Sequence, residues 1–157
     1  MKSSLIVVPV SQLLQKIVDI VGVVGDVIIY VSLNKNAEEM REIFMKSKKT
    51  VSNLFFIDCV SREGKSPDVL HIAPNELDKL DYAIRSFKDE IAGKKLIVLD
   101  ALSTLLIYNN ENKVAAFVNK VVNYAQVEDV SVLAFTPETK EEELLTKIFN
   151  FFDEVRK

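Results

Sequence analysis

Cysteine is almost absent from this sequence of 157 residues, and tryptophan is absent altogether. The single cysteine, Cys59, excludes a disulfide within the chain and a zinc site built from cysteines. It lies in an apolar run, where a cysteine side chain behaves as a small hydrophobic group. We therefore expect Cys59 to be a buried structural residue.

Long hydrophobic runs are also missing. Lys16, Asp19 and Asp26 interrupt the first thirty residues, and no later window approaches the ~18 apolar residues of a membrane span. The first apolar run, Leu5–Val10, ends at Ser11 and is too short for the core of a signal peptide. We therefore expect a cytoplasmic protein without a membrane partner.

There is no excess of positive charge, since the net charge is −3 at pH 7. A nucleic-acid-binding domain usually carries a basic surface. The one short basic cluster, Lys46, Lys48 and Lys49, is better explained as solvated surface. The four tyrosines are scattered and form no array on which bases could stack. We therefore expect no nucleic-acid partner.

Glycine and proline are scarce, with four of each, while apolar residues make up 48% and charged residues 27% of the chain. This is the composition of a compact globular protein without low-complexity segments. A chain of this length can bury roughly 70% of the surface that it exposes when unfolded. The sequence therefore predicts a single domain over residues 1–157.

Five short runs rich in Val, Ile, Leu or Phe predict strands that are buried on both faces of a sheet. They are Leu5–Val10, Val27–Ser32, Leu54–Asp58, Leu96–Asp100 and Val130–Thr136. Apolar residues at helical spacing lie between them, most regularly at Leu77, Leu80, Ile84 and Phe87. Ser11 is well placed as the N-cap of the first helix.

Strand and helix alternate along the chain, which indicates right-handed crossovers between parallel strands. The predicted fold is a three-layer α/β domain, with a mainly parallel five-stranded sheet and helices on both faces. The composition of Ser61–Pro67 is typical of an exposed loop. The stretch VLHIA, residues 69–73, is a candidate for a short sixth strand.

In sheets of this kind, ligands bind outside the carboxyl ends of the strands. Those ends carry Ser11, Asn34 with Lys35, Asp58, Asp100, and Thr136 with Glu138. Asp58 and Asp100 are therefore candidates for a shared cation site. Each carboxylate has a second interpretation as the cap of a helix or turn, which we favour because no third ligand is in view.

Five segments follow one another in an order and spacing that point to a known family. They are VIIYVSLNKNAEEMREIF, LFFIDC, APNELDKLDYAI, KKLIVLDALSTLLIY and VSVLAFTPETKEEELLTKIFNFFDEV. Together they resemble the RecA-type ATPase domain, in particular the archaeal branch related to the circadian-clock ATPase KaiC and the archaeal flagellar-motor ATPase. The resemblance implies that Asp100 is the Walker B aspartate, which contacts the water shell of Mg²⁺ in that family.

Two parts of the family's machinery are missing. Its phosphate loop, GxxxxGK followed by Ser or Thr, has no counterpart, because only Ser11 and Gln12 stand between Val10 and Leu13. Asn34 and Lys35 occupy the place of the glutamates that polarise the attacking water, and neither can act as that base at neutral pH. The resemblance therefore implies an inactive ATPase homologue with no catalytic residue, cofactor or metal.

Three hypotheses for function follow. The leading one is a non-catalytic RecA-like domain that binds a protein, as a scaffold or regulator, or that assembles with itself. The second is a sensor that binds a nucleotide or small anion without hydrolysis, through Ser11, Asn34 and Asp100. The third is a receiver-like signalling domain with Asp58 as phosphoacceptor, although the acidic pair and the lysine that such a domain needs are absent. The lone histidine, His71, is assigned no role.

The resemblance also predicts the strand order 3-2-4-5-1, counted along the chain, with Leu5–Val10 at the edge of the sheet. Pro9 is compatible with an edge strand, and an apolar edge favours pairing with another chain. Phe149, Phe151 and Phe152 in the last helix are candidates for an exposed contact patch. We expect a homodimer or a protein partner over these two elements. The alternative is that the three phenylalanines close the core.

Overall fold

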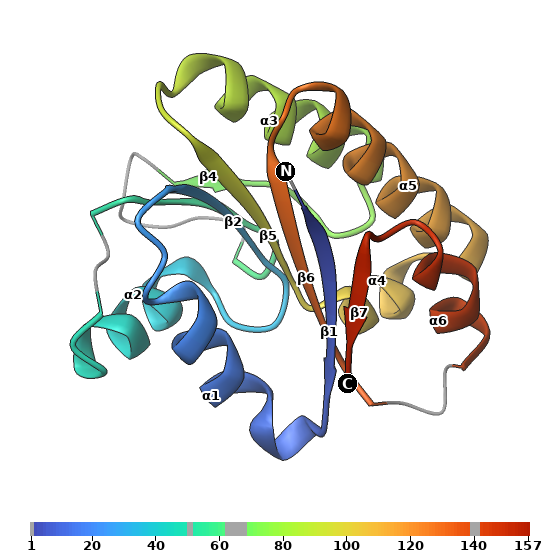
Figure 1. The fold of residues 1–157 in the computed structure, drawn as a ribbon, viewed down its shortest axis with the longest axis horizontal. Coiled ribbons are helices and arrows are strands. Elements are labelled where there is room, and N and C mark those ends of the chain that lie inside the picture. The colour runs from blue at the N-terminus through green and yellow to red at the C-terminus, as the bar shows by residue number, and fades with distance from the viewer. Residues whose placement is uncertain (1, 50–51, 62–68, 139–141) are drawn as a thin grey trace.

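The computed structural model describes residues 2–49, 52–61, 69–138 and 142–157. In that part of the chain the structure has one sheet of seven strands in the order β4-β3-β2-β5-β6-β1-β7 (Figure 1). Every strand pairing is parallel. The strands are β1 Ser3–Val8, β2 Val27–Ser32, β3 Leu54–Asp58, β4 Leu70–His71, β5 Lys95–Asp100, β6 Ser131–Pro137 and β7 Glu154–Arg156. Most of the segment predicted as an exposed loop, residues 62–67, lies outside the described residues.

Helices cover both faces of the sheet (Figure 1). They are α1 Val10–Val21, α2 Ala37–Lys46, α3 Leu77–Glu90, α4 Leu102–Tyr108, α5 Glu111–Val127 and α6 Glu142–Phe149. Side chains of α1 and α2 share one apolar cluster with the sheet, and side chains of α3, α4, α5 and α6 share the other. Alternate residues of each strand enter the two clusters, as Leu5 and Ile6 do. This two-sided burial explains why the strands are continuous apolar runs.

The predicted order of the five long strands is confirmed, because 3-2-4-5-1 corresponds to β3-β2-β5-β6-β1. The three-layer α/β class is confirmed too, and the candidate sixth strand is β4. The predicted number of five strands is wrong, since β4 and β7 extend the sheet at its two ends. Both added strands are short, with two and three residues. β4 lies in the stretch that the sequence offered as a candidate, whereas β7 has no apolar run by which it could be recognised.

The placement of the first strand at the edge of the sheet is wrong. β7 pairs with β1 in parallel, with Leu5 opposite Val155. Polar contacts fasten the two strands: the Ser4 hydroxyl donates to Glu154 at 2.9 Å, and the Lys2 ammonium lies 2.9 Å from the same carboxylate. Hydrogen bonds from Lys2, Ser4 and Arg156 lower the pKa of Glu154 to about 2. The outer strand therefore carries charge where an apolar edge was expected.

The start of the first helix also differs from the prediction. β1 ends at Val8, and Pro9 is the N-cap of α1, with φ −55°. Ser11 lies one residue inside the helix and does not cap it. The cause is the proline itself, which has no N–H to donate to a strand ladder and whose fixed φ suits the start of a helix. Because the apolar run continues through Val10, the sequence predicted that the strand ended there and not at Val8.

The three phenylalanines near the C-terminus close the core. Phe152 is only 7% exposed, and Phe149 and Phe151 are partly buried against the same apolar cluster as α5 and α6. Packing against the core therefore favours the alternative interpretation of these residues, and Phe151 and Phe152 lie beyond α6, which ends at Phe149. Of the two surfaces on which the expected interface was placed, the edge of β1 is covered by β7. The existence of a protein partner stays a prediction.

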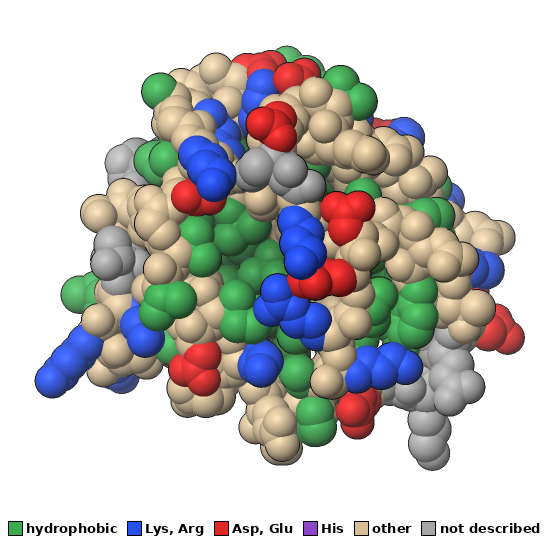
Figure 2. Space-filling view, viewed as in Figure 1, with side chains coloured by type: hydrophobic (Ala, Val, Ile, Leu, Met, Phe, Trp, Pro, Cys, Tyr) green, Lys and Arg blue, Asp and Glu red, His purple; other side chains and the backbone are tan. Residues whose placement is uncertain are grey.

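Charges of both signs are interspersed on the face shown in Figure 2, where acidic and basic side chains surround an apolar hollow. In the ranges that the structure describes, none of the helices combines the length and hydropathy needed to cross a bilayer.

We predict that Phe152→Ala lowers the free energy of unfolding by about 3 kcal/mol, because it leaves a cavity in the apolar cluster between the sheet and α3, α4, α5 and α6. Phe149→Ala should cost less, since this side chain is only partly buried. Urea denaturation followed by circular dichroism measures both. Equal stabilities for wild type and Phe152→Ala would contradict this account of the core.

Candidate functional site

All strands are parallel, so their carboxyl ends lie along one edge of the sheet. Asp58 ends β3 and Asp100 ends β5, with β2 between them. Ser32 at the end of β2 is in register with both. Neighbouring strands are ~4.8 Å apart, so the two acidic residues are separated by roughly 9–10 Å of sheet. This spacing does not favour a shared cation, and the described residues contain no group of three or more potential ligands placed for a metal ion.

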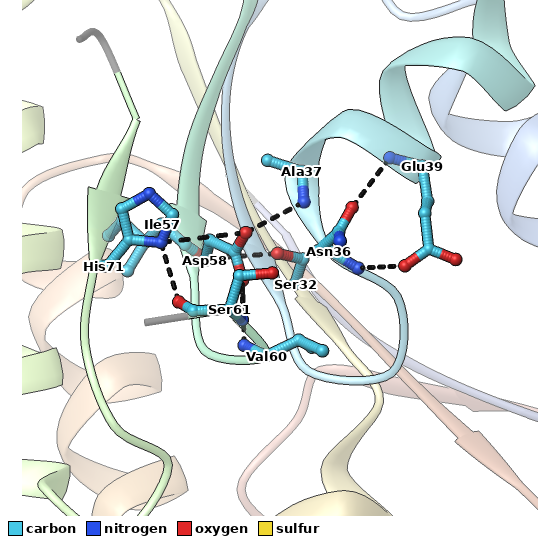
Figure 3. A network of polar contacts seen from close by, with 9 residues as sticks. All are labelled: Ser32, Asn36, Ala37, Glu39, Ile57, Asp58, Val60, Ser61 and His71. Carbon is cyan, nitrogen blue, oxygen red and sulfur yellow. Dashed lines mark hydrogen bonds and ion pairs between the residues drawn. The ribbon is translucent and has the colours of Figure 1, made fainter. Parts of the chain in front are cut away.

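Asp58 is held by the backbone around it (Figure 3). One carboxylate oxygen accepts hydrogen bonds from the N–H groups of Val60 and Ser61, at 2.8 and 2.9 Å. The other accepts from the N–H of Ala37 at 3.1 Å, in the first turn of α2. The side chain is 2% exposed. The carboxylate therefore caps both a turn and a helix, as the favoured interpretation predicted.

The neighbouring polar groups complete this local structure (Figure 3). Asn36 caps α2 in a reciprocal pair with Glu39, in which each side chain accepts a hydrogen bond from the other's backbone N–H. His71 Nδ1 lies 2.7 Å from the carbonyl oxygen of Ser61 and 3.8 Å from Asp58. A carbonyl only accepts, so Nδ1 is the donor. His71 therefore ties β4 to the turn after β3, which is the role of a partly buried structural side chain.

Asp100 is turned into the apolar layer beneath α1 and α2. It is 2% exposed, and its Oδ2 accepts a hydrogen bond from the Tyr30 hydroxyl. Its Oδ1 has no hydrogen-bond partner in the described part of the chain. Burial raises the pKa of this carboxyl to about 6, against the opposing effects of the Tyr30 bond and the positive charge of Lys35.

Tyr30 was missed by the sequence analysis. It is fully buried and packs against Phe44 and Phe56, and burial next to Asp100 raises its pKa well above the usual value. A signal was present: Tyr30 is a polar-tipped side chain in the middle of the apolar run of β2. A buried tyrosine hydroxyl usually finds a partner. Side chains two residues apart on a strand share a face, so Tyr30 and Ser32 lie on the same side of the sheet. Ser32 is in register with Asp100 on the neighbouring strand, so the Asp100 carboxylate lies on that side too.

The three residues proposed for a nucleotide site are not brought into one cluster. Ser11 is exposed on the first turn of α1. Asn34 is exposed too, and its side-chain oxygen accepts a hydrogen bond from the Thr104 hydroxyl in α4. Asp100 lies on β5, which β6 separates from β1. No hydrogen bond between the described side chains links Ser11 to either of the other two.

A cleft of about 1090 Å³ lies outside the carboxyl ends of β2, β3 and β4. The loop after β4 forms one side and α4 another. Its lining contains Leu33, Asn34, Cys59, Val60, Ser61, residues 71–76, Thr104, Ile107 and Tyr108. Among the described residues of this lining, Glu76 is the only carboxylate and none is a lysine or an arginine.

Comparison with known proteins places this geometry in a family and a fold. Residues 26–157 match the model of a family of unknown function, DUF7090. No curated protein matches the chain. Among solved structures, the KaiC-like protein PH0186 from the hyperthermophilic archaeon Pyrococcus horikoshii OT3 is similar over 98% of this chain and 69% of its own, with a TM-score of 0.60 and 14% identity. At this identity the similarity shows the fold alone, and it confirms the RecA-like fold that the sequence predicted.

We predict that Asp100→Asn stabilises the protein at pH 8 by about 2 kcal/mol, with little effect at pH 4. The folded-state pKa of about 6 lies above the usual 3.8, so the folded protein holds the proton more tightly than the unfolded chain. Wild-type stability is therefore full at low pH and is lost as the pH rises through this interval, whereas asparagine does not ionise. Urea denaturation from pH 4 to 8 measures the difference. The exposed Asp19→Asn is the control, and equal pH profiles for the wild type and Asp100→Asn would contradict the prediction.

We predict that Asp58→Ala lowers the free energy of unfolding by about 3 kcal/mol, since one buried and two partly buried N–H donors lose a charged acceptor. Asp58→Asn should cost less because one oxygen remains. Asn36→Ala removes only the reciprocal cap of α2, worth about 1 kcal/mol, and serves as the matched control. If Asp58→Ala cost no more than Asn36→Ala in urea denaturation, Asp58 would not be the main cap here.

Proposed function

The chain belongs to the DUF7090 family, and we propose that it is a non-catalytic RecA-like domain that acts through protein association, as a scaffold or regulator or by assembling with itself. One observation carries the proposal. Asp100 matches the metal-contacting aspartate of the RecA-type ATPases that the sequence resembles. It is 2% exposed here, and its carboxylate is hydrogen-bonded to the buried Tyr30 hydroxyl. A carboxylate in this position is directed into the core.

The connection between β1 and α1 supports the same proposal. The chain passes from Val8 through Pro9 directly into α1. No loop of backbone N–H groups is therefore available to surround phosphates. The carbonyl oxygen of Val8 accepts a hydrogen bond of 2.7 Å from the N–H of Glu138, which ties the end of β1 to the chain that follows β6. This direct passage from strand to helix favours a domain without a phosphate loop.

The residues at the place of the catalytic base support it as well. The Asn34 side-chain oxygen is engaged by Thr104, and an amide cannot take a proton from water at neutral pH. Lys35 is a cation whose charge acts on Asp100. Neither side chain can polarise a water molecule for attack.

The other two hypotheses receive less support. A nucleotide or anion sensor needs Ser11, Asn34 and Asp100 to converge, and the described side chains show no contact between Ser11 and the others. A receiver-like domain would have the flavodoxin-like order 2-1-3-4-5, which differs from the order here. Its phosphoacceptor would also need an accessible carboxylate, whereas both oxygens of Asp58 accept backbone hydrogen bonds.

We predict that the purified protein does not hydrolyse ATP with Mg²⁺ above the rate of a protein-free blank, because both the phosphate loop and the base are missing. Release of inorganic phosphate measures this directly. Isothermal titration with ATP and Mg²⁺ at about 1 mM ligand should give no heat of binding. ATP hydrolysis that disappears in Asp100→Ala and persists in Asp19→Asn would overturn the proposal, and ATP binding without hydrolysis would favour the sensor.

A further inference from the structure

Exposed apolar side chains gather at the cleft beside α4. Ile107 and Tyr108, at the end of α4, are 74% and 55% exposed, and Val60, after β3, is 45% exposed. All three line the cleft. Single exposed hydrophobic residues, such as Val23 and Val127, are normal on a protein surface. Three that border one hollow form a patch of the kind found where another molecule binds.

The interior of the cleft has the composition of an interface core. Its buried apolar members are Leu33, Cys59 and Ile72, with 3%, 6% and 6% exposure. The polar groups beside them are the uncharged side chains of Asn34, Ser61, Asn75 and Thr104 and the imidazole of His71. The carboxylate of Glu76 is paired with the Lys79 ammonium at 3.5 Å. Interface cores are similarly poor in charge and rich in aromatic residues such as tyrosine.

We propose that a second copy of this chain binds here in a two-fold dimer, in which the Ile107 and Tyr108 side chains of each protomer enter the cleft of the other. A two-fold interface uses the same surface on both partners, so that surface must carry both a projection and a hollow. The end of α4 supplies the projection, and the cleft beside it supplies the hollow. The patch is therefore complementary to itself.

Two further observations favour a second copy over a small ligand. A ligand held inside the cleft would leave most of Ile107, which is 74% exposed, in water, whereas a protomer would cover it. The chain has a net charge of −3, so two copies repel each other where their acidic residues meet. Among the described residues that line the cleft, the one carboxylate, Glu76, is already ion-paired. The inference rests on the self-assembly branch of the proposed function. The two can fail separately, because sedimentation tests the dimer and phosphate release tests whether the protein hydrolyses ATP.

Sedimentation equilibrium tests the dimer with three proteins. We expect the wild type to dimerise with a Kd on the order of 10 µM. Ile107→Lys should be monomeric at about ten times that concentration, because it places a charge at the centre of the interface. Val127→Lys makes the same chemical change at a valine that is 83% exposed and outside the cleft, and it should dimerise like the wild type.

A fluorescent reporter tests whether this surface forms the dimer. The chain has no tryptophan, so Tyr108→Trp introduces a single one at the rim of the cleft. Its emission should shift to the blue as the concentration rises through the Kd, in step with the mass. Tyr82→Trp, at a tyrosine of α3 that is 71% exposed and outside the cleft, should show no shift.

Two outcomes overturn the inference. One is a wild type that stays monomeric at about 200 µM, well above ordinary weak-dimer affinities. The other is a dimer that persists in Ile107→Lys while the Tyr108→Trp emission does not change, which would place the interface elsewhere. Circular dichroism checks that Ile107→Lys is folded, and Ile107→Ser replaces it if it is not. A monomer without ATPase activity would remove the dimer and leave the non-catalytic proposal intact.

Discussion

Burial of the sheet on both faces is the constraint on which the rest of this structure depends. Every long strand lies between two helical layers, so each polar side chain on it must find a partner inside the protein. Two carboxylates at the strand ends meet this requirement differently. Asp58 accepts three backbone hydrogen bonds and fixes the start of α2 and the turn after β3. Asp100 accepts one from Tyr30 and leaves one oxygen without a partner. The Asp58 carboxylate is therefore stabilising. The Asp100 carboxyl has a raised pKa because its negative charge would be poorly compensated in the core.

These two sites divide the carboxyl edge of the sheet into two parts. Around β5 and β1 the edge is closed by internal contacts: Asp100 turns toward Tyr30, and the end of β1 bonds to Glu138. Around β3 and β4 the edge is open, and a cleft lies between α4 and the loop after β4. In the RecA-like family that the fold resembles, the nucleotide belongs to the part that is closed here.

The parts of the structure that depend on local pattern could be predicted from the sequence. The five long strands are apolar runs, and Asp58 stands where a helix and a turn begin. The strand order followed from the family resemblance, since no local pattern encodes it. The features that were missed depend on contacts between distant residues. Tyr30 and Asp100 are 70 residues apart, and the bond between Ser4 and Glu154 spans 150 residues. A three-residue strand such as β7 has no periodicity of its own, so only its pairing with β1 makes it a strand.

The missed strand also changes where association can occur. Had β1 been the edge, its apolar residues would have presented an unpaired ladder to a second chain. β7 covers that ladder and carries Glu154 and Arg156, which form an ion pair at 2.7 Å on the outer strand. Charged side chains on an edge strand oppose extension of the sheet, because pairing would place them against another backbone. The opposite edge, β4, offers only two residues. Sheet extension is thus disfavoured at both ends, whereas exposed apolar side chains lie together at the cleft beside α4.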